Sequence, residues 1–137
     1  MAFRKKGLAS YGEVNATAGT AYANEVELVQ MLFDGLIDSL AMAEGQIARN
    51  EVQAKNESLG RASQIIIGLK SSLDFEKGGE IATNLNDLYG YCVQRVMSAN
   101  LNNDVDAIIE IKNLMVEIRE AWAQIPDLLN MKVANAS

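Results

Sequence analysis

Few side chains in this chain of 137 residues have the types and spacing that catalysis needs. The chain contains no histidine, which is the commonest general base near neutral pH. Glu76 and Glu80 are four residues apart, a spacing typical of a solvated helix face. No serine is paired with a base in a recognisable motif. The sequence therefore predicts that the protein is not an enzyme.

The absence of histidine also excludes several functions of helical proteins. Di-iron carboxylate bundles need a Glu-x-x-His pair on each of two helices. A bundle that carries phosphate on histidine would have no acceptor. The sequence also contains no Gly-rich phosphate loop followed by Lys and Ser or Thr. We therefore expect no metal and no cofactor.

Cys92 is the only cysteine, so no disulfide can form within the chain. It falls on an apolar stripe of an expected helix, where cysteine commonly acts as a small hydrophobic residue. A reactive thiol would need exposure and a lowered pKa. We expect a structural role for Cys92, in keeping with a reducing cytoplasm.

Composition predicts one globular domain in the cytoplasm. Hydrophobic residues make up 49% of the chain, and there is a single proline. The net charge is -6, and the only basic cluster is at residues 4–6, so we expect no nucleic-acid partner. No stretch approaches the roughly 20 apolar residues that span a bilayer. No apolar signal segment follows the basic start, so we expect neither membrane insertion nor secretion.

Apolar residues recur every three or four positions in four segments, which is typical of helices with one buried face. The pattern predicts helices over residues 24–50, 51–72, 80–101 and 103–125. The corners between them are short, so neighbouring helices should be antiparallel. We therefore expect an all-α fold, an antiparallel up-down-up-down four-helix bundle with a short N-terminal arm. Residues 1–22 would form the mobile arm, 23–130 the bundle, and 131–137 a disordered tail.

The third helix has two features that bear on packing. Its predicted stripe begins at Ile81 and includes Cys92, so that Tyr89 and Tyr91 lie beside it. These two tyrosines suit either the rim of the core or contact with a partner. Gly90 costs about 1 kcal/mol relative to alanine inside a helix. A close helix crossing at Gly90 would offset that cost.

The helices carry more apolar residues than four buried stripes require. The excess residues are Leu28, Ile65, Ile67, Val93, Met97 and Ile109. Met31 and Met42 also lie beside their stripes, and methionine suits surfaces that must accept more than one shape. Such rows indicate an exposed patch, a dimer face or a groove for a helix. The pattern alone leaves these three alternatives open.

Several short motifs, in order, resemble the FliS family of flagellar export chaperones. The most specific is the run at residues 73–80, LDFEKGGE. The others are Asn84-Leu85, Leu88-Tyr89-x-Tyr91, Ala99-Asn100, Asn103-Asp104, Thr17-Ala18, Glu27-Leu28, Met31-Leu32-Phe33-Asp34-Gly35 and Glu117-x-Arg119-x-Ala121-Trp122. Phe33 stands where the family usually has tyrosine. The resemblance covers residues 8–126.

The resemblance implies a helical bundle that binds flagellin. Family members hold the disordered C-terminal segment of flagellin in the cytoplasm, prevent its premature polymerisation and pass it to the flagellar export gate. An anti-sigma factor and other flagellar regulators are further implied partners. A conserved tyrosine of the family's N-terminal arm covers a groove that flagellin also uses, and Tyr11 matches that position.

On this basis we expect eight residues to form the flagellin-binding groove or the N-terminal cap. They are Leu8, Tyr11, Val14, Leu28, Met31, Tyr89, Val93 and Met97. The alternative from another class is a structural bundle that uses its extra apolar face to form a homodimer.

Overall fold

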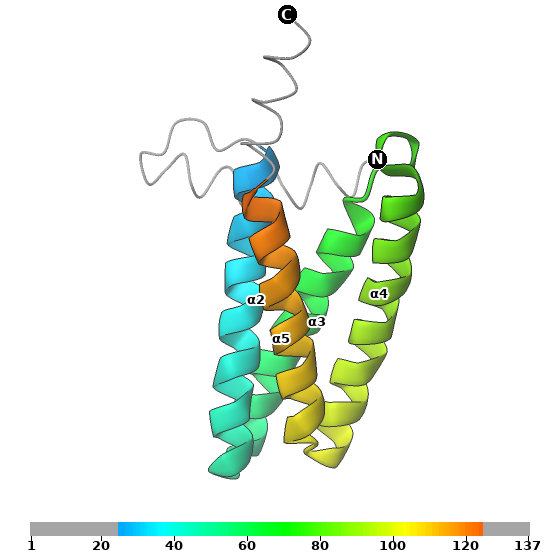
Figure 1. Cartoon of the computed structure of the whole chain (residues 1–137). Helices are drawn as coiled ribbons and strands as arrows, with labels where there is room; N and C mark the ends of the chain where they lie inside the picture. The colour runs from blue at the N-terminus through cyan, green and yellow to red at the C-terminus, as the bar shows by residue number, and fades with distance from the viewer. Residues whose placement is uncertain (1–24, 125–137) are drawn as a thin grey trace, which may run out of the picture.

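The computed structural model describes residues 25–124, which form four α-helices and no strand. The helices are α2 (Glu25–Ala48), α3 (Val52–Ser71), α4 (Phe75–Asn102) and α5 (Val105–Ala123). They run alternately in opposite directions (Figure 1), and α2 packs on α3 and α5 while α4 packs on α3 and α5. The predicted all-α antiparallel four-helix bundle is confirmed. The predicted arm and tail lie outside the described residues.

Aspartate side chains cap the start of α4 and of α5. The carboxylate of Asp74 accepts hydrogen bonds from the backbone N–H groups of Glu76 and Lys77, both at 3.0 Å. Asp104 accepts one from the N–H of Ala107 at 3.2 Å. Each cap satisfies donors that a helix leaves unpaired at its first turn. The last helix was predicted to begin at residue 103, but Asn103 instead ends α4 in a left-handed conformation with φ of 52°, and Asp104 caps α5.

The third helix begins earlier than predicted because Asp74 caps a turn before the glycines. Gly78 belongs to this turn, and a Cβ there would meet the Cβ of Ala82 at 2.8 Å, so a side chain does not fit. Gly79 has φ of 52° and ψ of -126°, which interrupts the helical backbone. Only glycine adopts such a conformation without strain. The helix therefore restarts after Gly79 in a new register.

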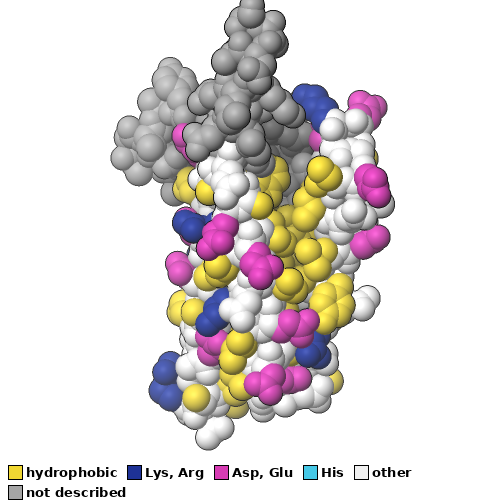
Figure 2. Space-filling model, in the orientation of Figure 1, with side chains coloured by type: hydrophobic (Ala, Val, Ile, Leu, Met, Phe, Trp, Pro, Cys, Tyr) yellow, Lys and Arg dark blue, Asp and Glu magenta, His cyan; other side chains and the backbone are white. Residues whose placement is uncertain are grey.

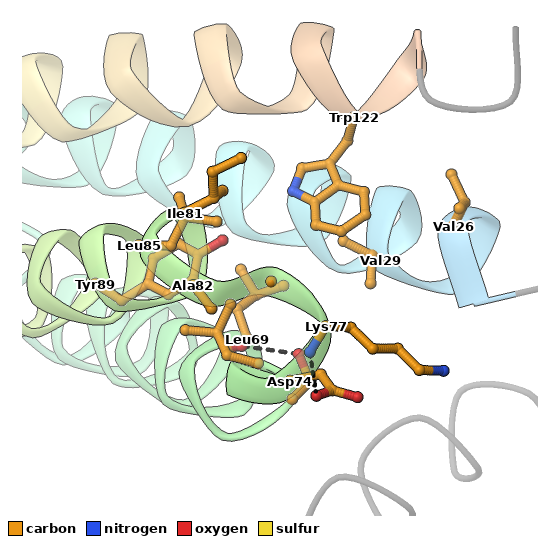
Figure 3. A pocket seen from close by; sticks show the side chains of 13 residues that line it. Val26, Val29, Leu69, Asp74, Lys77, Ile81, Ala82, Leu85, Tyr89 and Trp122 are labelled. Atoms are coloured by element: carbon orange, nitrogen blue, oxygen red, sulfur yellow. Dashed lines mark hydrogen bonds between the residues drawn. The ribbon is translucent and has the colours of Figure 1, made fainter. Parts of the chain in front are cut away.

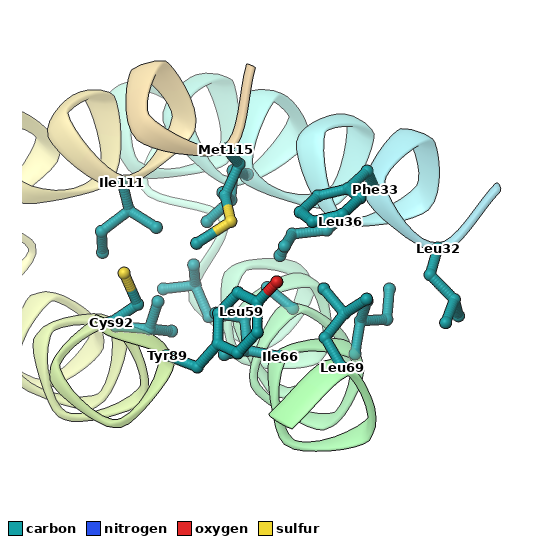
Figure 4. Packing of buried hydrophobic residues seen from close by; sticks show 14 of the residues in the cluster. Leu32, Phe33, Leu36, Leu59, Ile66, Leu69, Tyr89, Cys92, Ile111 and Met115 are labelled. Carbon is teal, nitrogen blue, oxygen red and sulfur yellow. The ribbon is translucent and has the colours of Figure 1, made fainter. Parts of the chain in front are cut away.

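The core is one continuous apolar cluster between the four helices (Figure 4). Its largest fully buried side chains are Phe33, Leu36, Leu40, Leu59, Ile66, Leu69, Tyr89, Val96, Ile108, Ile111 and Met115. The predicted stripes of α2 and α5 supply most of it. On α4 the prediction is wrong at its first position: Ile81 is 71% exposed, whereas Tyr89 is 1% exposed and points into the bundle. The buried positions Ala82, Tyr89 and Val96 are seven residues apart, so the buried face of this part of α4 passes beside Ile81 and not through it.

Gly90 does not mark a close helix crossing. The only atom within 4 Å of a Cβ built on Gly90 is the Nζ of Lys70, at an ordinary 3.7 Å. The predicted crossing is therefore wrong. No helix formed by residues 25–124 is long and apolar enough to cross a membrane.

Lys55 joins the start of α3 to the end of α4. Its ammonium group donates to the carbonyl of Asn100 at 2.9 Å and to the Oδ1 of Asn103 at 2.6 Å. The side chain is 6% exposed, so its charge is held mainly by these two oxygens. A cation at this position also suits the negative end of the α4 dipole. The Asn100 and Asn103 motif residues therefore have a structural task at this corner.

Candidate functional site

One hollow of the described residues lies at the end of the bundle where α4 begins and α5 ends. We call it the α4–α5 cavity; its volume is about 300 Å³. It is lined by Val26 and Val29 of α2, Leu69, Ser72 and Leu73 near the end of α3, Asp74, Lys77, Gly78, Ile81, Ala82, Leu85 and Tyr89 around α4, and Trp122 of α5. Figure 3 shows Trp122 pointing into the cavity opposite Ile81 and Leu85. Lys77 and Asp74 are its only charged lining residues, so the cavity suits apolar side chains.

An apolar surface continues from this cavity between α4 and α5. Leu88 of α4 and Leu114 and Ile118 of α5 pack against the core while remaining partly exposed. In Figure 2, apolar side chains gather along the line between these two helices. Such a surface buries large apolar side chains of a partner without requiring matched charges.

A polar cluster joins α4 to α5 further along the bundle. The Tyr91 hydroxyl donates to Glu110 Oε1 at 2.7 Å, and Arg95 pairs with Glu110 Oε2 at 3.1 Å. We call these three residues the Tyr91–Arg95–Glu110 cluster. The hydrogen bonds from Tyr91 and Arg95 lower the pKa of Glu110. The same contact with Glu110 raises the pKa of Tyr91. The cluster therefore connects α4 to α5 at a point further along the bundle than the apolar surface.

A second hollow lies on the other side of α4, against α3. We call it the α3–α4 groove; its volume is about 510 Å³, and it is more open than the cavity. It is lined by Ile67, Lys70, Ser71, Phe75, Asn86, Gly90, Val93 and Gln94. The side chains of Ile67 and Phe75 are exposed within it. Because Gly90 has no side chain, the middle of the groove stays open.

The predicted site residues do not lie in one place in the structure. Tyr89 lines the α4–α5 cavity, and Val93 lines the α3–α4 groove. Met97 lies one turn after Val93 on the same face and is 63% exposed. Met31 is partly buried against the core. Tyr89 and Val93 therefore belong to two separate hollows that flank α4.

Two of the predicted site residues are more buried than the sequence suggested. Leu28 is a core residue, so its predicted place off the buried stripe is wrong. Tyr89 was expected beside the stripe and instead forms part of the core, where burial raises the pKa of its hydroxyl. Leu8, Tyr11 and Val14 lie outside the described residues. Their role in a cap stays a prediction.

The sequence interpretation missed the residues that line most of the cavity. Ile81 was assigned to a buried stripe although it is largely exposed, and Leu85 and Trp122, which also line the cavity, are partly exposed. The available signal was the seven-residue spacing of Ala82, Tyr89 and Val96, which places these three residues on one face of the helix. Val26 carried no signal, because it lies in the first turn of α2 and belongs to no stripe.

Cys92 has the structural role predicted for it. Its side chain is fully buried in the core. Burial, with a smaller contribution from the negative charge of Glu110, raises the pKa of the thiol to about 11. At neutral pH the thiol is therefore protonated, and Cys92 packs in the core as a small apolar side chain. Among residues 25–124, no group of three or more potential ligands could hold a metal ion.

The sequence profile of a family described as "Flagellar protein FliS" matches residues 8–128. The chain belongs to the FliS family. It is 44% identical to the flagellar secretion chaperone FliS of Salmonella typhimurium over 124 residues, covering 90% of this chain and 92% of the relative. Identity to FliS of Escherichia coli is 39% over 123 residues, with 89% and 90% covered. Identity to FliSB of Pseudomonas aeruginosa is 36% over 120 residues, with 88% and 95% covered.

The family resemblance predicted from the motifs is thus confirmed. Membership of the FliS family places the chain among flagellar secretion chaperones rather than enzymes. This agrees with the prediction that the protein is not an enzyme, which was made from the absence of catalytic residue patterns.

Proposed function

We propose that this flagellar secretion chaperone binds the disordered C-terminal segment of flagellin in the cytoplasm, prevents its premature polymerisation and delivers it to the flagellar export gate. The observation that carries the proposal is the pair of apolar hollows flanking α4. A client that lacks structure has no fixed shape to match a small polar pocket. It can instead place several apolar side chains along a rigid bundle.

The energetics favour a surface of this kind. Ordering a disordered segment costs about 2–5 kcal/mol. Buried apolar area contributes about 25 cal/mol per Å², so roughly 200 Å² offsets the larger of these costs. Ile81 beside the cavity and Phe75 in the α3–α4 groove already expose apolar area in the free protein. Burying these side chains under the client supplies affinity without unfolding the chaperone.

The N-terminal arm fits this proposal as a cover for the α4–α5 cavity. Val26, in the first turn of α2, lines the cavity, so the described part of the chain begins beside it. We propose that Tyr11, with Leu8 and Val14, occupies the cavity until the client displaces it. Tyr11→Ala should then tighten client binding while leaving the helix content measured by circular dichroism unchanged. A large loss of helix in this variant would make Tyr11 a core residue and contradict the proposal.

A polymerisation assay tests the chaperone function. Purified flagellin is induced to polymerise with and without an equimolar amount of this protein, and light scattering follows filament growth. The proposal predicts suppressed growth for full-length flagellin. The matched control is an equimolar amount of a chaperone variant with Ile81→Ser, which should suppress growth less. Unchanged growth with the wild-type protein would refute the proposal.

The homodimer alternative makes a different prediction. A dimer that buried the α3–α4 groove would have twice the chain's 14.9 kDa in light scattering, with or without flagellin present. A mass near that of one chain, rising only when client is added, supports the chaperone proposal.

A further inference from the structure

Residues 80–88, in the first half of α4, are a weakly held wall of the α4–α5 cavity. Within residues 80–88 the only buried side chain is Ala82, which is small, whereas Tyr89, the next residue and the one before Gly90, is fixed in the core with its hydroxyl hydrogen-bonded to Trp122. Three larger apolar side chains, Ile81, Leu85 and Leu88, remain partly or largely exposed. Segments with few buried apolar contacts open more readily than the core.

Two glycines bound this wall, and both have free space around them. Gly79 interrupts the helix, and no atom lies within 4 Å of a Cβ built there. Gly90 lies inside the helix with only the flexible end of Lys70 nearby. Glycine lowers the stability of a helix locally, and open surroundings let its backbone turn without a clash.

The second half of α4 is fixed more firmly. The Tyr91–Arg95–Glu110 cluster ties it to α5 directly after Gly90. Cys92, Val96 and Ala99 are buried in the core, and Lys55 holds the end of the helix. Gly90 therefore separates a fixed half from a loosely held half.

The cavity in its present form is small for a helical ligand. One turn of α-helix, about 10 Å wide and 5.4 Å long, fills about 420 Å³. The cavity holds about 300 Å³. We propose that residues 80–88 swing away from α5 about Tyr89 and Gly90, and that this motion opens the cavity to a helical segment of the client. The identity of the client rests on the proposed function, whereas the motion itself does not.

Hydrogen exchange in the free protein tests the motion without any client. The amides of residues 83–90 should exchange about ten-fold or more faster than those of residues 93–101. Gly90→Ala fits the available space and should slow exchange over residues 83–90 roughly five-fold. Gly68→Ala is the matched control, because Gly68 is also helical, with no atom within 4 Å of its Cβ, but lies on α3. Exchange of both halves of α4 at one rate, or equal slowing by the two variants, would overturn the proposal.

Stopped-flow binding of the C-terminal flagellin peptide then tests the role of the motion. Gly90→Ala should lower the association rate several-fold, and Gly68→Ala should leave it at the wild-type value. Equal association rates for both variants would overturn the proposed role of the wall. Absence of binding to the wild-type protein would refute flagellin as the client, while the exchange result would still decide the motion.

Discussion

Replacing Ile81 should separate client binding from folding stability. Ile81 lines the α4–α5 cavity yet is 71% exposed, so most of its apolar surface is available to a ligand. Full burial of such a side chain is worth about 1.5–3 kcal/mol. Scaling by the exposed fraction gives about 1–2 kcal/mol, which corresponds to roughly 5–30-fold weaker binding for Ile81→Ser. Isoleucine and serine have similar helix propensities, so the helix itself should change little.

Calorimetric titration of the C-terminal flagellin peptide measures this effect, and urea unfolding measures stability. The matched control is Leu101→Ser, because Leu101 is 84% exposed on the same helix but lines neither hollow. The control should bind the peptide as the wild type does. Wild-type affinity in Ile81→Ser, or equal weakening in both variants, would show that the cavity does not bind the client.

Three further predictions concern the bundle that supports the site. Lys55→Met should lower the free energy of unfolding by about 2 kcal/mol or more, because it removes two charge-assisted hydrogen bonds at a buried position. The control is Lys70→Met, because the side chain of Lys70 forms no hydrogen bond or ion pair within residues 25–124. It should lower the free energy of unfolding by less than about 1 kcal/mol in the same urea experiment. Equal destabilisation by Lys55→Met and Lys70→Met would contradict the proposed role of Lys55. The pKa of Glu110 is lower in the folded state than in the unfolded state, where it is about 4.3. The contribution of Glu110 to folding stability is therefore complete above the unfolded-state pKa and is lost as the pH falls through the folded-state pKa. Unfolding curves of wild type and Glu110→Gln should therefore converge below about pH 4, and a constant difference would contradict the proposed contact. Cys92 should resist a thiol reagent at pH 8 until the protein is unfolded, since burial raises its pKa to about 11; rapid labelling of the native protein would contradict its burial.

The helices could be predicted from sequence because each buried face repeats along the chain. Helices α2, α3 and α5 begin and end close to their expected bounds. Their apolar spacing, the asparagine-rich corners and the scarcity of proline all indicate the same arrangement. Agreement between such independent local signals is what makes a bundle predictable.

The site was harder to predict because it depends on backbone details that spacing does not reveal. The Gly-Gly pair indicated a positive φ, but not that Gly79 alone would adopt it. Nor did the spacing show that Ala82, rather than Ile81, faces the core. The contact of Lys55 with Asn100 joins positions 45 residues apart, and no periodic pattern indicates it. Val93, which lines the α3–α4 groove, could be singled out because it exceeds what one buried stripe needs.

Titration of the purified protein with the C-terminal flagellin peptide tests the central claim most directly. We expect one peptide per chain, a negative heat-capacity change from apolar burial, and a gain of helix by circular dichroism. The heat should depend little on salt, because both hollows are mainly apolar. A titration without heat of binding at several temperatures, and without any gain of helix, would contradict the account.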